Sequence, residues 1–308
     1  MILKIFLSFL LSICFIFFIF YYFPVKEGAS LLEEIYPWQV FLSSNTLAQG
    51  DTLAIRIKTE KDFKEITATF GDEQVPFSKL QNSDWLGITG ASVKKEPGKY
   101  KLSVNLGDEV FGKNIAVAER NFPITELAVM KELEEKGYTP SNISQNIAQK
   151  DNVSIYDVFK IYTPTAFFNK PFIFPLKKIE VVGLFGSIRK SNDITLQHLG
   201  VDLEADEDTP VYAVNDGRVV FSEELIDYGK TIIIDHGLGI YSLYLHLNKY
   251  KFTKGQNVKE GDVIGLSGNT GYSIAPHLHF SIKISRPDVF LSIDPLKFLK
   301  STQFMDNE

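Results

Sequence analysis

The chain has 308 residues, which is enough for more than one domain. Its formal net charge is −6, so it lacks the basic character by which nucleic-acid-binding proteins are recognised. A single cysteine, Cys14, excludes an internal disulfide framework and a cysteine-rich zinc site. We therefore expect a multidomain globular protein with no nucleic-acid partner.

The N-terminal segment is a nearly unbroken apolar run from Ile5 to Phe23, ended by Pro24. A helix made of this run would be about 28 Å long, enough to cross a bilayer. A cleaved signal peptide is the alternative, but its apolar region is normally shorter, roughly 7–15 residues. We predict a transmembrane helix over residues 1–23 that anchors the chain in the cell membrane. The charge of Lys4 favours a cytoplasmic N-terminus, with the body exported to the periplasmic or extracellular face.

Short runs rich in β-branched and aromatic residues, separated by turn residues, occupy residues 36–120. This pattern is typical of a β-sandwich, and we expect an immunoglobulin-like module. The predicted strands are 40–42, 53–58, 66–70, 100–104 and 114–118. The region contains no histidine and no cysteine, so we assign no chemistry to it. It serves either as a spacer or as a binding module for a partner such as a regulatory protein.

Residues 121–172 are predicted to form a small helical connector. Thr125 can cap a helix from Glu126 to Lys136, with Gly137 ending it. Two more helices are expected, one capped by Ser141 and running to Gln149, the other covering 155–161. Because the connector directly precedes the next domain, we expect it either to restrain that domain or to act as a passive spacer.

Residues 173–300 are predicted to be almost entirely β, with no useful helix before a C-terminal tail at 301–308. Two hairpins are expected across turn signals: 211–214 with 218–221, and 231–235 with 240–246. Five glycines further along predict turns: Gly255, Gly261, Gly265, Gly268 and Gly271. Overall the fold class is mainly β.

Two of the five histidines, His277 and His279, stand two apart in an alternating run near the C-terminus. On a β-strand such residues share one face, so both imidazoles point the same way. The intervening Leu278 and the following Phe280 then point into a core. This arrangement predicts a pair of histidines presented from the surface of a sheet.

His198 and Asp202 are four residues apart, with Gly200 between them. If the segment is extended, the three positions share one face, and Gly200 places no side chain between the other two. Two imidazoles and one carboxylate are the ligands of a catalytic Zn²⁺ that keeps a fourth position for water. We predict that His198, Asp202 and His279 hold one zinc ion per chain.

The remaining histidines divide into candidate catalysts and a structural residue. No His-Glu-x-x-His helix is present, so the glutamate that usually serves as general base is missing. His246 and His277 are the candidates for proton transfer, and the sequence does not divide the roles between them. His236, at a predicted hairpin tip, is expected to be structural. Tyr272 is expected to line a groove, and the acidic loop 206–208 to be solvated.

Seven short motifs follow one another between residues 198 and 280. They are His198-Leu-Gly-Val-Asp202, Pro210-Val-Tyr-Ala-Val, Asp216-Gly-Arg-Val-Val, Ile234-Asp-His-Gly, Tyr244-Leu-His-Leu, Gly268-Asn-Thr-Gly and Pro276-His-Leu-His-Phe. In this order they resemble the lysostaphin/LytM-type zinc endopeptidases, which cut peptide cross-links in bacterial peptidoglycan. The resemblance covers about residues 174–300. One departure lies at 185–189, where relatives more often have one residue fewer before the arginine.

The resemblance implies an antiparallel β-rich domain with a groove over its sheet. It also implies that His198, Asp202 and His279 bind zinc and that His246 and His277 are a catalytic pair outside the ligand set. The expected function is zinc-dependent hydrolysis of peptidoglycan cross-links by a membrane-anchored, exported enzyme. The alternatives are a catalytically silent scaffold that activates a separate wall amidase, and a wall-binding adaptor. All five positions are occupied, which favours the enzyme, while the scissile bond stays open.

Overall fold

The structure is a computed structural model that describes residues 37–127, 129–192, 194–286 and 289–306. The predicted anchor, residues 1–23, lies outside the described residues. Among the described helices, none is long and apolar enough to cross a membrane. The unit considered below begins at Trp38.

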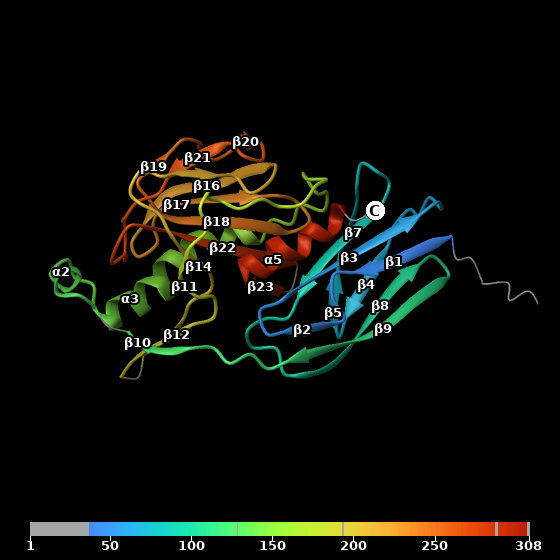
Figure 1. Ribbon diagram of the computed structural model, residues 1–308, viewed down its shortest axis with the longest axis horizontal. Helices are drawn as coiled ribbons and strands as arrows, with labels where there is room; N and C mark the ends of the chain where they lie inside the picture. Colours follow the sequence, from blue (N-terminus) through green and yellow to red (C-terminus); the bar gives the residue numbers. More distant parts are fainter. Residues whose placement is uncertain (1–36, 128, 193, 287–288, 307–308) are drawn as a thin grey trace, which may run out of the picture. The chain divides into compact units, whose positions relative to one another are not determined.

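Two sheets that share one hydrophobic core form the first part of this unit (Figure 1). Their strand orders are β1-β3-β7-β6 and β2-β9-β8-β4-β5. The strands are β1 Trp38–Leu42, β2 Thr46–Ala48, β3 Thr52–Thr59, β4 Thr67–Phe70, β5 Glu73–Val75, β6 Phe77–Lys79, β7 Trp85–Gly90, β8 Gly98–Leu106 and β9 Glu109–Ala118. Each sheet contributes buried residues to this core, for example Ile55 from β3 and Val104 from β8. Two sheets around a shared core are the arrangement expected of a sandwich, whereas the immunoglobulin-like assignment and the boundaries 36–120 stay predictions.

Strand β7 is the longest of the strands in this sandwich that the sequence pattern does not predict. All six of its residues are buried, so the run does not alternate between apolar and polar positions. It lies between β3 and β6 and is hydrogen-bonded to both. A central strand covered on both faces lacks the two-residue period from which half-buried strands are recognised.

The predicted helix from Glu126 to Lys136 is wrong in its first half. Thr125 lies in strand β10 (Ile124–Glu126), which pairs in parallel with β12 (Ile188–Ser191). The helix α2 covers only Lys131–Glu134, and Gly137, with φ of +89°, ends it as expected. Pairing with a strand more than sixty residues away overrides the local helix signal, because propensity is a weak prior.

A single longer helical segment follows α2, in place of two separate helices. It consists of α3 (Pro140–Asn146), the π-helical turn η1 (Ile147–Asp151) and α4 (Asn152–Phe159). The predicted cap Ser141 is wrong, because Pro140 occupies the first turn and Thr139 accepts the hydrogen bond from the Asn142 amide. Below, this segment from Pro140 to Phe159 is called the connector helix.

The second part of the unit is built on a large, mainly antiparallel sheet with the order β11-β14-β22-β18-β17-β16-β20, to which β23 adds beside β22. Its strands are β11 Val181–Gly183, β14 Val201–Glu204, β16 Gly217–Leu225, β17 Gly229–Asp235, β18 Ile240–Leu247, β20 Asn257–Val258, β22 His277–Arg286 and β23 Val289–Ile293. The predicted pairing of 231–235 with 240–246 is confirmed by β17 and β18. Leu278 and Phe280 are fully buried, also as predicted.

The face of this sheet opposite to Leu278 and Phe280 is partly covered by the connector helix. Ile155 and Phe159 of α4 share a buried cluster with Tyr241, Leu243 and Leu245 of β18. The part of the face beyond the helix carries the side chains of His277 and His279. The sheet therefore has an apolar core on one side and the candidate site on the other.

The predicted hairpin between 211–214 and 218–221 is wrong. Strand β15 (Pro210–Tyr212) pairs with β21 (Val263–Leu266) in a small sheet completed by β19 (Lys249–Tyr250), whereas β16 pairs with β17 and β20. Asn215 is buried, and its side-chain amide donates to the carbonyl oxygens of Lys170 and Pro171. This side chain links the turn to a distant segment, and β15 before the turn and β16 after it belong to different sheets. Gly265 correspondingly lies in β21 and not in a turn.

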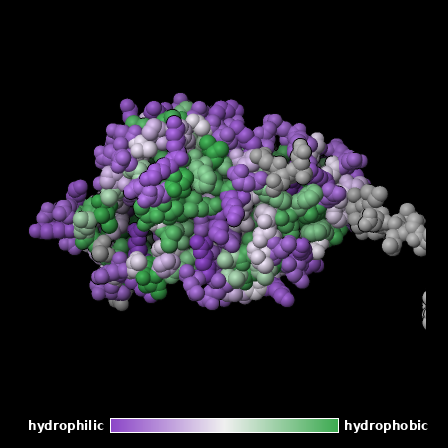
Figure 2. Space-filling view, in the orientation of Figure 1, coloured by the Kyte–Doolittle hydropathy of each residue, from purple (hydrophilic) through white to green (hydrophobic). Residues whose placement is uncertain are grey.

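A C-terminal helix that the sequence pattern missed replaces the expected tail. Helix α5 covers Pro295–Thr302 and continues as a 3₁₀ turn through Gln303–Asp306. Asp294 caps it by accepting hydrogen bonds from the next amides, and Pro295 occupies the first turn. Phe298 and Leu299 are buried in the core below the large sheet. Figure 2 shows hydrophobic side chains gathered over the C-terminal strands, with hydrophilic ones around them.

Candidate metal centre

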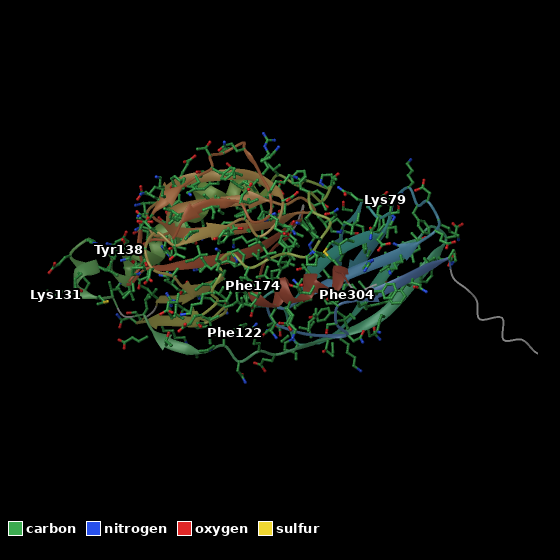
Figure 3. The ribbon with its side chains drawn as sticks, turned by 45° about the horizontal axis from the view of Figure 1, so that its top comes forward. Lys79, Phe122, Lys131, Tyr138, Phe174 and Phe304 are labelled. Carbon is green, nitrogen blue, oxygen red and sulfur yellow. The ribbon has the colours of Figure 1, made fainter. Side chains whose placement is uncertain are left out.

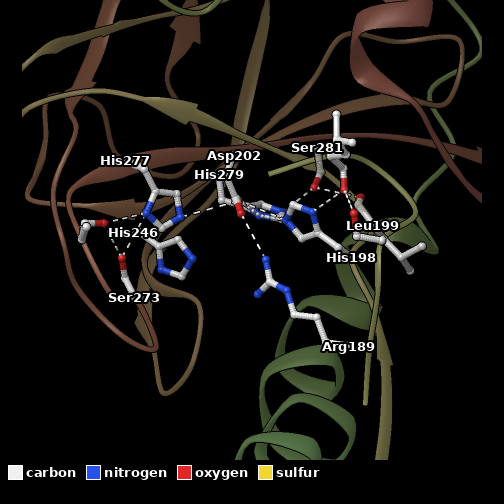
Figure 4. A network of polar contacts seen from close by, with 12 residues as sticks. Arg189, His198, Leu199, Asp202, His246, Ser273, His277, His279 and Ser281 are labelled. Carbon is white, nitrogen blue, oxygen red and sulfur yellow. Dashed lines mark hydrogen bonds and ion pairs between the residues drawn. The ribbon is translucent and has the colours of Figure 1, made fainter. Parts of the chain in front are cut away.

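Three side chains converge at the junction of β14 and β22. The two strands pair antiparallel, with Asp202 directly opposite His279, and His198 lies just before β14. The Oδ1 atom of Asp202 lies 3.0 Å from Nε2 of His198 and 2.9 Å from Nδ1 of His279. The two imidazole nitrogens are themselves 3.0 Å apart (Figure 4). We call His198, Asp202 and His279 the metal centre.

Hydrogen bonds behind the metal centre orient both imidazoles. The Nδ1–H of His198 donates to the carbonyl oxygen of Leu184 at 2.9 Å, which leaves Nε2 facing inward. On the other side, Nε2 of His279 lies 2.8 Å from Oγ of Ser281, and this hydroxyl donates to the carbonyl of Leu199. The hydroxyl therefore accepts from Nε2–H, and Nδ1 of His279 faces inward without a proton. Such outer partners fix the tautomers that metal ligation needs.

The donor set fits a divalent metal ion. Two inward-facing imidazole nitrogens and a carboxylate oxygen lie within 4.8 Å of one another. Burial opposes ionisation of Asp202, but hydrogen bonds from the surrounding histidines outweigh it and hold its pKa well below the usual value. A nitrogen–oxygen set with three protein ligands is that of catalytic zinc sites. In the described part of the chain, no other group of three such side chains converges in this way.

Two glycines make room for the metal centre. A Cβ atom at Gly200 would lie 2.4 Å from Nε2 of His279, and one at Gly183 would lie 2.2 Å from Oδ2 of Asp202. Neither distance is possible without moving a ligand. A side chain at Gly200 would therefore press on His279, whereas the expectation that Gly200 leaves space between His198 and Asp202 stays a prediction. The requirement at Gly183, which comes from a neighbouring strand, is not visible in the sequence.

His246 and His277 lie beside the metal centre as a pair. Their ring centroids are 4.9 Å apart, and Nε2 of His277 lies 3.6 Å from Oδ1 of Asp202. Each holds its Nδ1 against a backbone carbonyl, His246 on Thr270 and His277 on Ala275. Their Nε2 atoms are thereby left for the site. His246 also has a φ of +60°, an uncommon conformation for a residue other than glycine and one that recurs at functional sites.

The two histidines differ in their electrostatic surroundings. Burial lowers the pKa of His246 to about 3, and the neighbouring histidines act in the same direction. Burial alone would also lower the pKa of His277, but its contact with Asp202 outweighs this, and the net shift is upward. The pKa of His279, a member of the metal centre, is lowered by burial to about 4. A pair with opposite shifts suits proton transfer in both directions.

Arg189 is a site residue to which the sequence analysis gave no role. It comes from β12, and its Nη2 lies 3.4 Å from Oδ2 of Asp202. Oδ1 faces the histidines, so Arg189 engages the oxygen that they leave free. Its position depends on β12 pairing with β10 and β13 (Ile194–Gln197), and no spacing in the sequence reports that arrangement.

The metal centre opens into a cleft of about 530 Å³. We call this space the cleft. It is lined by the metal centre, His246, His277 and Tyr272, and the connector helix forms one of its walls. That wall presents Ile143, Ile147, Asn152 and Ile155. Tyr272 lines the cleft, as predicted, and its ring lies 5.7 Å from that of Tyr138. Tyr138, labelled in Figure 3 near α2, also donates from its hydroxyl to the carbonyl of Ile226.

The connector helix is fastened to the rim of the cleft by a buried carboxylate. Asp151 accepts hydrogen bonds from the backbone amides of Ile226, Asp227 and Tyr228. The side chain of Asp151 therefore points towards the loop formed by residues 226–228. Burial, followed by the charge of Asp151, raises the pKa of Asp227 to about 7.

The other polar residues considered in the sequence lie away from the metal centre. His236 is fully buried, with Nδ1 on the carbonyl of Asp216 and Nε2 on the hydroxyl of Ser242, and burial lowers its pKa to about 4. These contacts support its predicted structural role. Residues 206–208 are exposed, as expected of a solvated loop.

Comparison with known proteins places this geometry in a family. Residues 196–290 match the family described as Peptidase family M23. The chain carries a peptidase family M23 domain. This match confirms the family resemblance that the ordered motifs indicate, and it includes all five histidine and aspartate positions discussed above.

Two relatives and one solved structure illustrate the match. An uncharacterized metalloprotease of Buchnera aphidicola subsp. Baizongia pistaciae is 35% identical over 148 residues, covering 47% of this chain and 38% of that protein. The peptidoglycan DD-endopeptidase ShyA of Vibrio cholerae is 44% identical over 85 residues, covering 28% and 20%. The chain thus spans less than half of either relative. A crystal structure from Pseudomonas aeruginosa assigned to peptidase M23 covers 82% of this chain and 95% of its own, with a TM-score of 0.58 and 21% identity, which shows a shared fold.

Proposed function

We propose that the chain is a zinc-dependent endopeptidase that hydrolyses peptide cross-links of bacterial peptidoglycan. The observation that carries this proposal is the convergence of His198, Asp202 and His279 with two further histidines in one cleft of an M23 domain. The name of the Vibrio cholerae relative supports peptidoglycan as the substrate. Occupation of all five positions favours the enzyme over a catalytically silent scaffold.

In this proposal the metal centre holds the zinc ion, which supplies Lewis-acid polarisation of the scissile carbonyl and of the attacking water. His246 and His277 move the protons. With Nδ1 held by a backbone carbonyl, each presents Nε2 to the reacting atoms, so one can accept the proton of water while the other stabilises developing charge or protonates the leaving amine. Arg189 holds the carboxylate of Asp202 in place through its second oxygen.

Hydrolysis of defined substrates tests the proposal. The zinc-loaded protein is incubated with cross-linked muropeptides of known structure, and the products are identified by mass spectrometry. We expect cleavage within the cross-link, with the scissile bond read from the product masses. A chelator should abolish the reaction and added zinc should restore it. Absence of cleavage by fully zinc-loaded, folded protein would contradict the proposal.

We also propose that residues 1–23 anchor the protein in the cell membrane and that the remainder is exported. The apolar run from Ile5 to Phe23 and the charge of Lys4 support this topology. Protease added to intact spheroplasts should digest the body of the protein. Full protection until the cells are lysed would contradict export.

A further inference from the structure

The cleft extends well beyond the metal centre along β22. Four alternate residues of this strand line it: His277, His279, Ser281 and Lys283. Alternation places them on one face of the sheet. Four residues of a β-strand span about 13 Å, so Lys283 lies about that far from His279. The cleft therefore has a catalytic end and a distant end that presents a lysine.

The floor between the two ends is apolar. Leu245 of β18 is paired with His279, and Leu243 is paired with Ser281, so both flank the line from the metal centre to Lys283. Both leucines line the cleft, and they pack with Ile155 of the connector helix, which also lines it, in one buried cluster. A bound chain running along β22 would thus cross an apolar stretch before it reaches a charged group.

The ammonium group of Lys283 has no acidic partner in the described part of the chain. Its Nζ donates to Oγ of Ser292, the residue paired with it on β23, at 2.9 Å. The ring of Phe159 also lies near this ammonium group, with its centroid 5.8 Å from Nζ. Arg189, the arginine of the cleft, differs in that it has Asp202 within ion-pair distance. Among the ion pairs between described residues, none includes Lys283.

A partly buried cation without a counterion is costly, because the cleft removes part of its hydration. Burial lowers the pKa of Lys283 to about 8, which leaves the group mostly protonated at neutral pH. Of its three N–H donors, one is used by Ser292. The others remain for a ligand that enters the cleft. A carboxylate would neutralise the charge and use these donors.

We propose that Lys283 binds a carboxylate of the substrate at the end of the cleft distant from the metal centre. The inference rests on the proposed function, since it names a substrate group recognised by the same cleft. An extended peptide advances about 3.3–3.6 Å per residue, so the carboxylate would stand about four residues from the scissile bond. Lys283 is thus a residue that determines specificity, and it takes no part in the chemical step.

The test uses two matched series of cross-linked peptides with the full-length, zinc-loaded protein. In one series a carboxylate stands two to six residues from the scissile bond, and in the other a carboxamide replaces it. We expect the carboxylate to lower KM by about 10- to 100-fold, as a charged hydrogen bond does, with an optimum near four residues and little change in kcat. Lys283→Met should remove this preference, and Lys283→Arg should retain most of it. Lys254→Met, a change of an exposed lysine outside the cleft, is the matched control.

Calorimetric binding of the same peptides separates this inference from the proposed function. If the protein cleaves both series with equal KM, or if Lys283→Met keeps the carboxylate preference, the inference is overturned while the peptidase proposal stands. If the protein cleaves neither series, the peptidase proposal fails, and carboxylate-selective binding lost in Lys283→Met would still support the inference. Equal binding of both series would overturn it. Should Lys283→Met fail to fold, loss of selectivity in Ser292→Ala and its retention in Lys283→Arg decide the question.

Discussion

The sandwich and the large C-terminal sheet use β-strands in different ways. In the sandwich, two sheets bury their facing sides around a hydrophobic cluster, and no histidine is present. The large sheet packs one side on a second core through residues such as Leu278 and Phe280, and Leu86 and Ile88 of the sandwich strand β7 also belong to this core. Its other side is only partly covered by the connector helix and presents His277 and His279. A sheet that is well packed on one face can therefore keep polar groups in register on the other.

Removal of a metal ligand should have the largest effect on the polar face of the large sheet. His198→Ala or His279→Ala should reduce bound zinc from about one per chain to near zero, because a three-ligand site loses its geometry with one ligand. Activity should fall with the metal. Metal analysis of the purified protein is the measurement, and Asp208→Ala, in the exposed loop, is the control. A fully zinc-loaded His279→Ala protein would show that the assignment is wrong.

The next change separates catalysts from ligands on the same face. His246→Ala and His277→Ala should keep the zinc while kcat/KM falls by about 10²-fold or more, the usual effect of losing a general acid or base. Zinc content and hydrolysis are measured on the same samples. If either variant loses zinc in proportion to its activity, that histidine belongs among the ligands.

Large-to-small substitutions in the sandwich core and in the core of the large sheet should have different effects on the metal centre. Ile55→Ala in the sandwich and Leu278→Ala in the large sheet should each lower the free energy of unfolding by about 2–5 kcal/mol, since both side chains are fully buried. Only Leu278→Ala should weaken zinc binding, because Leu278 lies between His277 and His279. Denaturant unfolding and zinc titration measure the two effects. Weakened zinc binding in folded Ile55→Ala would mean that the sandwich shapes the site.

The smallest expected effect concerns the loop that holds the connector helix. Burial, with the charge of Asp151, raises the pKa of Asp227 to about 7, above its value in the unfolded chain. The folded state therefore binds this proton more tightly than the unfolded chain does. The resulting contribution of Asp227 to stability is complete at low pH and is lost as pH rises through about 7. Asp227→Asn should raise the Tm at pH 8 but not at pH 4.

Thermal unfolding of the wild type and Asp227→Asn across this pH range measures the effect, with exposed Asp208→Asn as the control. Identical pH profiles for wild type and Asp227→Asn would contradict the assignment. That the connector helix restrains the cleft stays a prediction. Because α4 shares a core with β18, Asp151→Ala is a gentler test than deletion of the connector.

Local sequence determined the metal centre to a large extent. The spacing of His277 and His279 fixes one face of a strand, and His198, Gly200 and Asp202 occupy one short segment. Strand periodicity converts the spacing of His277 and His279 directly into geometry, since side chains alternate along β22, whereas His198 and Gly200 lie before β14. The pairing of β17 with β18 was predictable for a similar reason, because a short glycine-rich turn joins the two strands.

The places where distant segments meet depend on tertiary contacts. Thr125 entered a strand because β12 offers a parallel partner, and the strands on either side of Asn215 separated because its amide binds a segment more than forty residues away. The places of Arg189 and Lys283 in the cleft likewise depend on which strands are neighbours. Such contacts join residues that share no local period, so their free energy comes from packing and hydrogen bonds formed only in the folded chain. The sequence by itself thus specified the ligands of the candidate metal site, and the fold selected the residues that surround them.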